Sequence, residues 1–212
     1  DTASYDDTFA ITTGVTVDLT TSSATDQYGS IDTLVSIENI FGSSFDDVIT
    51  GDAGDNTLDG WLGNDTIVGG DGNDIIIGGM QTDIDTMTGG LGSDTFKYLT
   101  SSHGEFTSDG DLTLANIDII TDFTTNLAAV FDTVEDILDF REFLSQDATY
   151  HVVTAYSANV AGYFQVNANG DLWVDRDGYD QNIYNPSYVV NVGQQWSTDD
   201  VINLINAGQI LV

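Results

Sequence analysis

The sequence predicts an all-β fold in which a parallel β-roll, a right-handed β-solenoid, forms the centre of the chain. Two observations lead to this prediction: a glycine- and aspartate-rich unit recurs almost every nine residues, and each unit has a large apolar residue at one fixed position. The six units begin at Gly42, Gly51, Gly60, Gly69, Gly78 and Gly89, and only the fifth has two extra residues. A flexible glycine-rich linker would not have this regular apolar position.

Each unit combines a turn with a short strand. Glycine tolerates positive φ, so the first half of the unit can bring main-chain carbonyls close together. The sixth position has Asp or Asn, which supplies a hard oxygen atom. The eighth position is apolar and should point inward while its neighbours point outward; its residues are Ile49, Leu58, Ile67, Ile76, Met87 and Phe96.

Two units should form one coil of turn, strand, turn and strand, with coils stacked about 4.8 Å apart. Turns of alternate units then lie above one another, which predicts one column of Asp47, Asp65 and Asp85 and another of Asn56, Asp74 and Asp94. Stacked carboxylates repel unless a cation lies between them. Oxygen-only ligands favour Ca²⁺ over Mg²⁺, and the absence of Cys and His from the repeats disfavours zinc and copper.

Composition limits the possible partners. The 212 residues include 35 acidic and 3 basic side chains, a formal charge of −32. Nucleic acid and anionic membrane surfaces are therefore poor partners, because both need basic patches. The 41% hydrophobic content is enough for a core, which predicts folding that depends on cations rather than permanent disorder. Without cysteine, bound calcium would take the place of disulfides.

We see neither a transmembrane run nor an N-terminal signal peptide in the sequence. Because the chain starts at Asp1 in mid-pattern, we expect it to be a piece of a larger protein.

We expect three regions. Residues 1–41 form a β lead-in that caps the roll, with a strand over 15–19 and inward Leu34, Ile37 and Ile40; residues 42–97 form the repeat roll; and residues 98–212 form a C-terminal capping region. The last region should form an antiparallel β cap, with alternating strands over 150–155, 162–166, 171–175 and 188–192 and the turn residues 169–170 and 177–178 between them. Ser197 or Thr198 should cap a short helix with an apolar face of Val201, Leu204 and Ile205. The helix should stop at Gly208 and be followed by a strand over 209–212.

The repeat resembles the calcium-binding nonapeptide of repeats-in-toxin (RTX) proteins, which has the form G-G-x-G-x-D-x-U-x. The resemblance implies that each ion lies between turns of alternate units and takes the sixth-position Asp of both. It thus implies several Ca²⁺ ions on Asp65, Asp74, Asp85 and Asp94, with Asp47 and the weaker Asn56 beside them. Main-chain carbonyls would complete the shells, from Gly60, Leu62, Gly69, Gly70, Asp71, Gly72, Gly79, Gly89, Gly90, Leu91 and Gly92.

Flanking segments resemble those of serralysin-type proteases and RTX adhesins. In that comparison Glu38 falls at a calcium ligand, although an exposed strand residue is the alternative. Asp111 and Asp118 match two loop aspartates that hold a further ion, with Asp109 and Asp122 as competitors. The cluster of Asp175, Asp177 and Asp180 resembles part of a calcium loop but lacks its twelfth-position Glu.

We predict that the chain is not an enzyme. The two histidines, His103 and His151, have no partner motif, and the H-E-x-x-H motif of serralysin-type proteases is absent.

The resemblance implies a calcium-dependent folding and export module of a large adhesin. Its C-terminal segment would be presented to a type I secretion transporter, and its location would be extracellular or on a bacterial cell surface. The alternatives are a calcium-dependent adhesive or carbohydrate-binding module, for which Trp61, Trp173 and Tyr179 could offer stacking surface, and a stalk spacer without a role in secretion.

Overall fold

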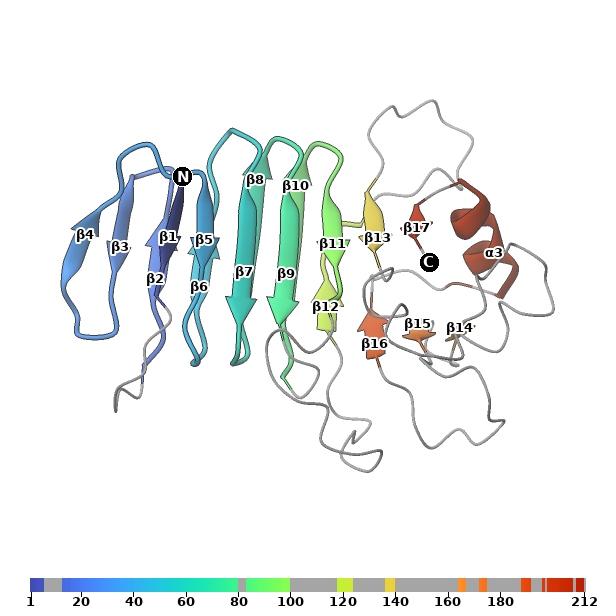
Figure 1. Cartoon of the computed structure of the whole chain (residues 1–212). Helices are drawn as coiled ribbons and strands as arrows, with labels where there is room; N and C mark the ends of the chain where they lie inside the picture. Colours follow the sequence, from blue (N-terminus) through green and yellow to red (C-terminus); the bar gives the residue numbers. More distant parts are fainter. Residues whose placement is uncertain are drawn as a thin grey trace.

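The computed structural model describes residues 1–5, 13–79, 83–99, 118–123, 136–139, 164–166, 172–174, 188–191, 196, 198–207 and 209–211. Within these residues, the regular structure is a series of short strands and the helix α3 (Thr198–Ala207). Figure 1 shows the strands side by side along one long axis, with the N-terminal strands at one end and α3 at the other. The predicted all-β parallel roll is confirmed.

One sheet has seven strands, and all neighbouring strands in it are parallel. Its order is β1 (Thr2–Ser4), β5 (Asn39–Phe41), β7 (Thr57–Trp61), β9 (Ile75–Gly79), β11 (Thr95–Lys97), β13 (Ile137–Asp139) and β17 (Ile210–Leu211).

The other sheet has ten strands. Its order is β14 (Phe164–Val166), β15 (Leu172–Val174), β16 (Tyr188–Asn191), β12 (Asp118–Ile120), β10 (Thr86–Leu91), β8 (Thr66–Asp71), β6 (Val48–Thr50), β2 (Thr16–Asp18), β3 (Ser23–Thr25) and β4 (Ile31–Thr33). Strands from β16 to β2 pair in parallel, while both ends of the sheet close with antiparallel pairs.

Successive units alternate between the two sheets, so two units make one coil as predicted. Leu58 therefore pairs with Ile76 in one sheet, and Ile49 pairs with Ile67 in the other. The longer fifth unit keeps the register, because Met87 still pairs with Ile67.

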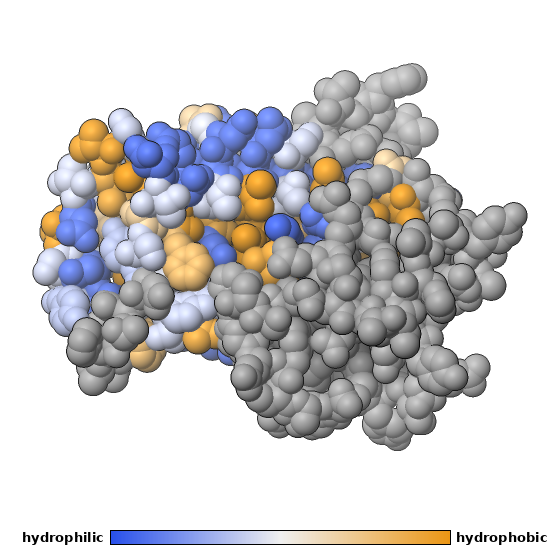
Figure 2. Space-filling view, viewed as in Figure 1, coloured by the Kyte–Doolittle hydropathy of each residue, from blue (hydrophilic) through white to orange (hydrophobic). Residues whose placement is uncertain are grey.

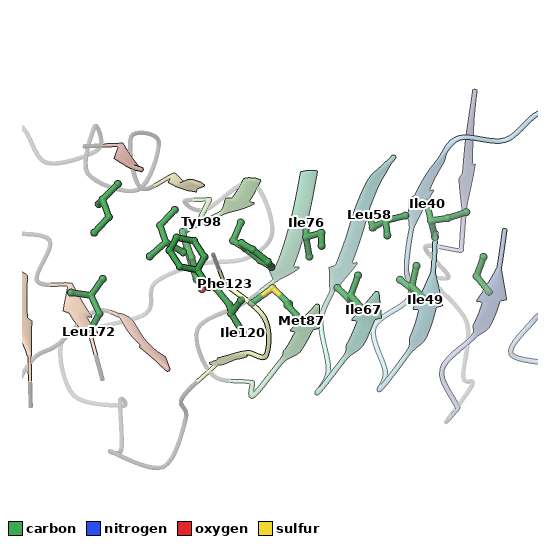
Figure 3. Close-up of a cluster of buried hydrophobic side chains, with 14 of the residues drawn as sticks. Ile40, Ile49, Leu58, Ile67, Ile76, Met87, Tyr98, Ile120, Phe123 and Leu172 are labelled. Atoms are coloured by element: carbon green, nitrogen blue, oxygen red, sulfur yellow. The ribbon is translucent and has the colours of Figure 1, made fainter. Parts of the chain in front are cut away.

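The core is a double row of apolar side chains between the sheets. Ile40, Leu58 and Ile76 from one sheet face Ile49, Ile67 and Met87 from the other (Figure 3). All six eighth-position side chains are at most 1% exposed, as is Ile40. At the N-terminal end, Leu34 is buried and Ile37 packs partly against the core, in agreement with the predicted cap.

The stack of coils extends beyond the repeats. At the C-terminal end, β16 pairs in parallel with β12, and β17 pairs in parallel with β13, so β16, α3 and β17 continue the coils. The helix, β17 and strands β14 to β16 lie within their predicted ranges. The strand predicted over 150–155 lies outside the described residues.

Candidate metal centre

The sixth-position side chains form the two predicted columns, one along each edge of the roll. Each side chain lies just before a strand, in register with the same position one coil away. Strand pairing adds one aspartate to each column, which gives the series Asp47, Asp65, Asp85 and Asp118 and the series Asn56, Asp74, Asp94 and Asp136. All eight side chains are buried.

One carboxylate oxygen of each aspartate in the columns connects adjacent coils. The amide N–H of Asp47 donates to Asp65 Oδ1 at 2.8 Å, and the amide of Asp65 donates to Asp85 Oδ1 at 2.9 Å. The other column repeats this contact from Asp74 to Asp94 Oδ1 at 2.9 Å. These bonds fix the register of the carboxylates.

The second oxygen of four of these carboxylates is different. Oδ2 of Asp65, Asp74, Asp85 and Asp94 is buried and accepts no hydrogen bond from the described residues. Leaving a buried charged acceptor without a partner is costly, and a protein normally compensates by protonation or by metal coordination. The four oxygens therefore indicate a place on each edge that favours a positively charged partner.

Burial raises the pKa of each of these groups. The pKa of Asp65 is raised to about 9, mainly by desolvation, with the neighbouring carboxylates of Asp85 and Asp47 adding to it. The pKa of Asp85 is raised to about 7, and those of Asp74 and Asp94 to about 6, again with desolvation as the largest cause. Burial thus disfavours the bare anion of each group, and most strongly that of Asp65.

Main-chain oxygens converge on the same places. A Cβ atom on Gly60 would lie under 3.0 Å from both Asp65 Oδ2 and the carbonyl oxygen of Gly78 in the next coil. On the other edge, a Cβ on Gly69 would meet Asp74 Oδ2 and the Gly89 carbonyl in the same way. Gly60 and Gly69 therefore each leave a cradle lined by a carboxylate and a carbonyl oxygen.

This donor set fits Ca²⁺. In the described part of the chain, no three His, Cys, Asp or Glu side chains are grouped to hold a metal. The oxygens that lie together are carboxylate and main-chain carbonyl oxygens. Calcium accepts six to eight mixed oxygen ligands in flexible geometry, whereas Mg²⁺ requires a tight octahedron. The fit rests on Asp65, Asp74, Asp85 and Asp94 together with the glycine carbonyls.

The remaining predicted residues fall into several groups. Side chains of Asp71 and Leu91 are exposed, so only their main chain could face an ion. The Glu38 carboxylate is exposed and pairs with the Asp1 amino group. Asp118 begins β12 in the column that contains Asp85, while its predicted partner Asp111 lies outside the described residues, as does the cluster of Asp175, Asp177 and Asp180.

Asp122, the competitor of Asp118, has a different role. Its carboxylate accepts the amides of Gly89 at 2.9 Å and Gly90 at 2.8 Å, so it closes the last repeat turn.

Sequence reasoning missed Asp136. Its Oδ1 accepts the amide of Asp94 at 3.0 Å, and it is 3% exposed. The sequence does contain a signal for it. An aspartate is followed two positions later by a large apolar residue, both from Asp136 to Leu138 and from Asp94 to Phe96.

The fold and the columns together define a calcium-binding β-roll. Comparison with protein families agrees: residues 36–67 and 62–96 match the RTX calcium-binding nonapeptide repeat, which is described as four copies. This segment of the chain therefore consists of RTX repeats, and the repeats bind calcium ions.

A solved structure similar to this chain is described as the solution structure of the AlgE6R3 subunit from the Azotobacter vinelandii mannuronan C5-epimerase. The two are 22% identical with a TM-score of 0.42, and the match covers 78% of each chain. At this level the similarity says nothing about function. Comparison with curated proteins returned no match. Among the described residues, no helix has the length and apolar character needed to cross a membrane.

Proposed function

We propose that the chain is a calcium-gated folding and export module of a large secreted or cell-surface adhesin, and that it has no catalytic activity. The observation that supports the proposal best is the set of four buried carboxylate oxygens without a hydrogen-bond partner, on Asp65, Asp74, Asp85 and Asp94. A fold with these groups in its interior depends on a cation at neutral pH.

Without calcium, electrostatics oppose the compact state. A formal charge of −32 makes the chain repel itself, and the stacked carboxylates concentrate that repulsion along two lines. In a cytoplasm with little free calcium the chain stays unfolded, which is the state that can pass through a narrow export channel.

Outside the cell, calcium reverses the balance. Extracellular calcium modules typically have dissociation constants of about 10⁻⁴–10⁻³ M. A ligand that binds the folded chain and not the unfolded one adds its binding free energy to folding. The folded roll is then too wide to return through the channel.

The C-terminal segment is proposed to serve the transporter. The elements β16, α3 and β17 follow one another at the end of the roll, and α3 packs through buried Val201 and Leu204. In an unfolded chain this segment is free to be recognised, while after export it becomes the last coil of the roll.

An export assay tests this proposal. The chain is co-expressed with a type I transporter, and its appearance in the medium is compared with that of a variant lacking residues 188–212. We expect the deletion to abolish export. Because the export substrate is unfolded, loss of folding in the variant does not account for the result. Undiminished export of the deletion variant would contradict the signal role.

The adhesive alternative has one described candidate surface. Trp61 is half-buried, and its ring centroid lies 5.7 Å from that of Phe41. The side chains of Trp173 and Tyr179 are not among those that the structure describes. Binding to a glycan array that requires calcium and is lost in Trp61→Ala would favour this alternative.

A further inference from the structure

The six repeat turns have two different conformations at their second position. In the last four units this residue has positive φ: 76° at Trp61, 120° at Gly70, 141° at Gly79 and 107° at Gly90. In the first two units the second residues, Ser43 and Asp52, are not among the described residues with positive φ. The difference decides where the amide of the second residue points.

In the first unit the amide points into the carboxylate. Ser43 N–H donates to Asp47 Oδ2 at 2.6 Å, the Ser43 hydroxyl donates to Asp47 Oδ1 at 2.7 Å, and Val15 N–H donates to the same Oδ1 at 2.7 Å. Asp47 thus has hydrogen-bond donors on both oxygens from the protein itself.

In the second unit the amide acts in the same way. Asp52 N–H donates to Asn56 Oδ1 at 2.8 Å, and Asn56 Nδ2 donates to the carbonyl of Glu38 at 2.9 Å. A carboxylate could not make the second of these bonds. The neutral amide therefore ends the column on this edge.

The later units lack this closure. Trp61 N–H donates to Asp59 Oδ1 at 3.1 Å, and Gly90 N–H donates to Asp122, so neither amide reaches the carboxylate of its own unit. Trp61 retains a left-handed conformation that is unfavourable for a residue with a side chain. The second-position amide of that unit therefore points away from Asp65, although the residue at this position is not glycine.

We infer that the first two nonapeptide units bind no calcium, because the amides of Ser43 and Asp52 occupy the place that the cation takes in the later units. The calcium columns begin at Asp65 and Asp74. The N-terminal coil is a metal-free cap built on RTX-like sequence. This inference rests on the calcium-binding function of the repeats and specifies which carboxylates use it.

A matched pair of substitutions tests the inference. Asp47→Asn and Asp65→Asn each remove one charge from the same column, and bound calcium is counted by equilibrium dialysis, with folding followed by circular dichroism. We expect Asp47→Asn to bind as many ions as the unaltered chain. Asp65→Asn should lose at least one ion or weaken binding about tenfold. Loss of an ion in Asp47→Asn would overturn the inference.

The converse substitution, Asn56→Asp, keeps the test decisive if Asp47→Asn does not fold. The new carboxylate would face the Glu38 carbonyl and the Asp52 amide, so we expect no additional ion and a lower thermal midpoint. An additional ion or tighter binding in Asn56→Asp would show that the turn accepts calcium and that the inference is wrong.

The same measurements separate this inference from the proposed function. Ion counts in the three variants test the inference, whereas a calcium-induced folding transition of the unaltered chain tests calcium-gated folding. Either can fail without the other.

Discussion

Each sixth-position aspartate in the later units uses its two carboxylate oxygens for different purposes. Asp74 Oδ1 accepts the amide of Asn56 at 2.8 Å and holds the register, while Oδ2 has no protein partner. An asparagine keeps the first contact and replaces the second oxygen with a donor, which repels a cation. The two functions can therefore be separated by a single substitution.

We predict that Asp74→Asn raises the calcium midpoint of folding about tenfold, which corresponds to about 1.4 kcal/mol. Asp32→Asn removes the same charge from an exposed position in β4 and should leave the midpoint almost unchanged. Calcium titrations of both variants by circular dichroism check the prediction. Equal midpoints would mean that only net charge matters.

A second prediction concerns the close contact between coils. Gly70 and Gly29 both have positive φ, but a Cβ on Gly70 would clash with the Asp52 carbonyl, while nothing lies within 4 Å of a Cβ on Gly29. Gly29→Ala should cost only about 1–2 kcal/mol of backbone strain. Gly70→Ala should be destabilised by a larger amount, and thermal unfolding in saturating calcium checks the difference.

The sequence predicted the columns within the repeats because a fixed nine-residue period determines which side chains stack. It did not predict that the turns of Asp47 and Asn56 are closed, because that depends on the φ of the second residue. Residue type alone does not reveal this: Ser43 and Trp61 both replace glycine, yet only Trp61 has positive φ.

At the scale of elements, the strands are stabilised by their inward side chains rather than by their length. Ile76 and Ile75 are adjacent in β9, but Ile76 is 0% exposed and Ile75 is 39% exposed. The alternation places one side chain in the double row and the other outside. Figure 2 shows the visible face of the described roll as a mixture of hydrophilic and hydrophobic residues.

We predict that Ile76→Ala lowers the stability of the calcium-bound roll by about 2–5 kcal/mol, because it leaves a cavity between the sheets. Ile75→Ala should cost less than about 1 kcal/mol, since its side chain already contacts solvent. Thermal unfolding of both variants in saturating calcium provides the comparison. A similar loss of stability in both variants would contradict the inward orientation of Ile76 and the outward orientation of Ile75.

For the elements at the two ends, the sequence predicts their type but not how they pair. Helix α3 was expected from its capping residue and its apolar face, and the C-terminal antiparallel strands from their alternation and turn residues. The parallel pairing of β16 with β12 and of β17 with β13 joins residues far apart in sequence, so no local pattern indicates it.

At the scale of the whole molecule, protons and calcium compete for the same carboxylates. Burial raises the pKa of Asp65 to about 9 and of Asp85 to about 7, above the ordinary value of 3.8. The metal-free folded chain therefore holds more protons than the unfolded chain between about pH 4 and the raised values. Its stability is greatest at low pH and decreases as the pH rises through that window.

We predict that metal-free protein gains β structure when the pH is lowered from about 8 to about 5.5, which is still above the sequence pI of about 4.1. Because calcium must displace the same protons, its apparent affinity should fall over this range. Circular dichroism in chelator and calcium titrations at both pH values check the two effects. Loss of β structure on acidification would contradict the assigned pKa shifts.

The most direct test of calcium-gated folding is a calcium titration of chelator-stripped protein at neutral pH, followed by far-ultraviolet circular dichroism, with magnesium as the control. We expect a cooperative transition from coil to β structure at roughly 10⁻⁴–10⁻³ M calcium and none with magnesium. A chain that is already fully folded in chelator at neutral pH would contradict the account, because its buried carboxylates would then need no cation.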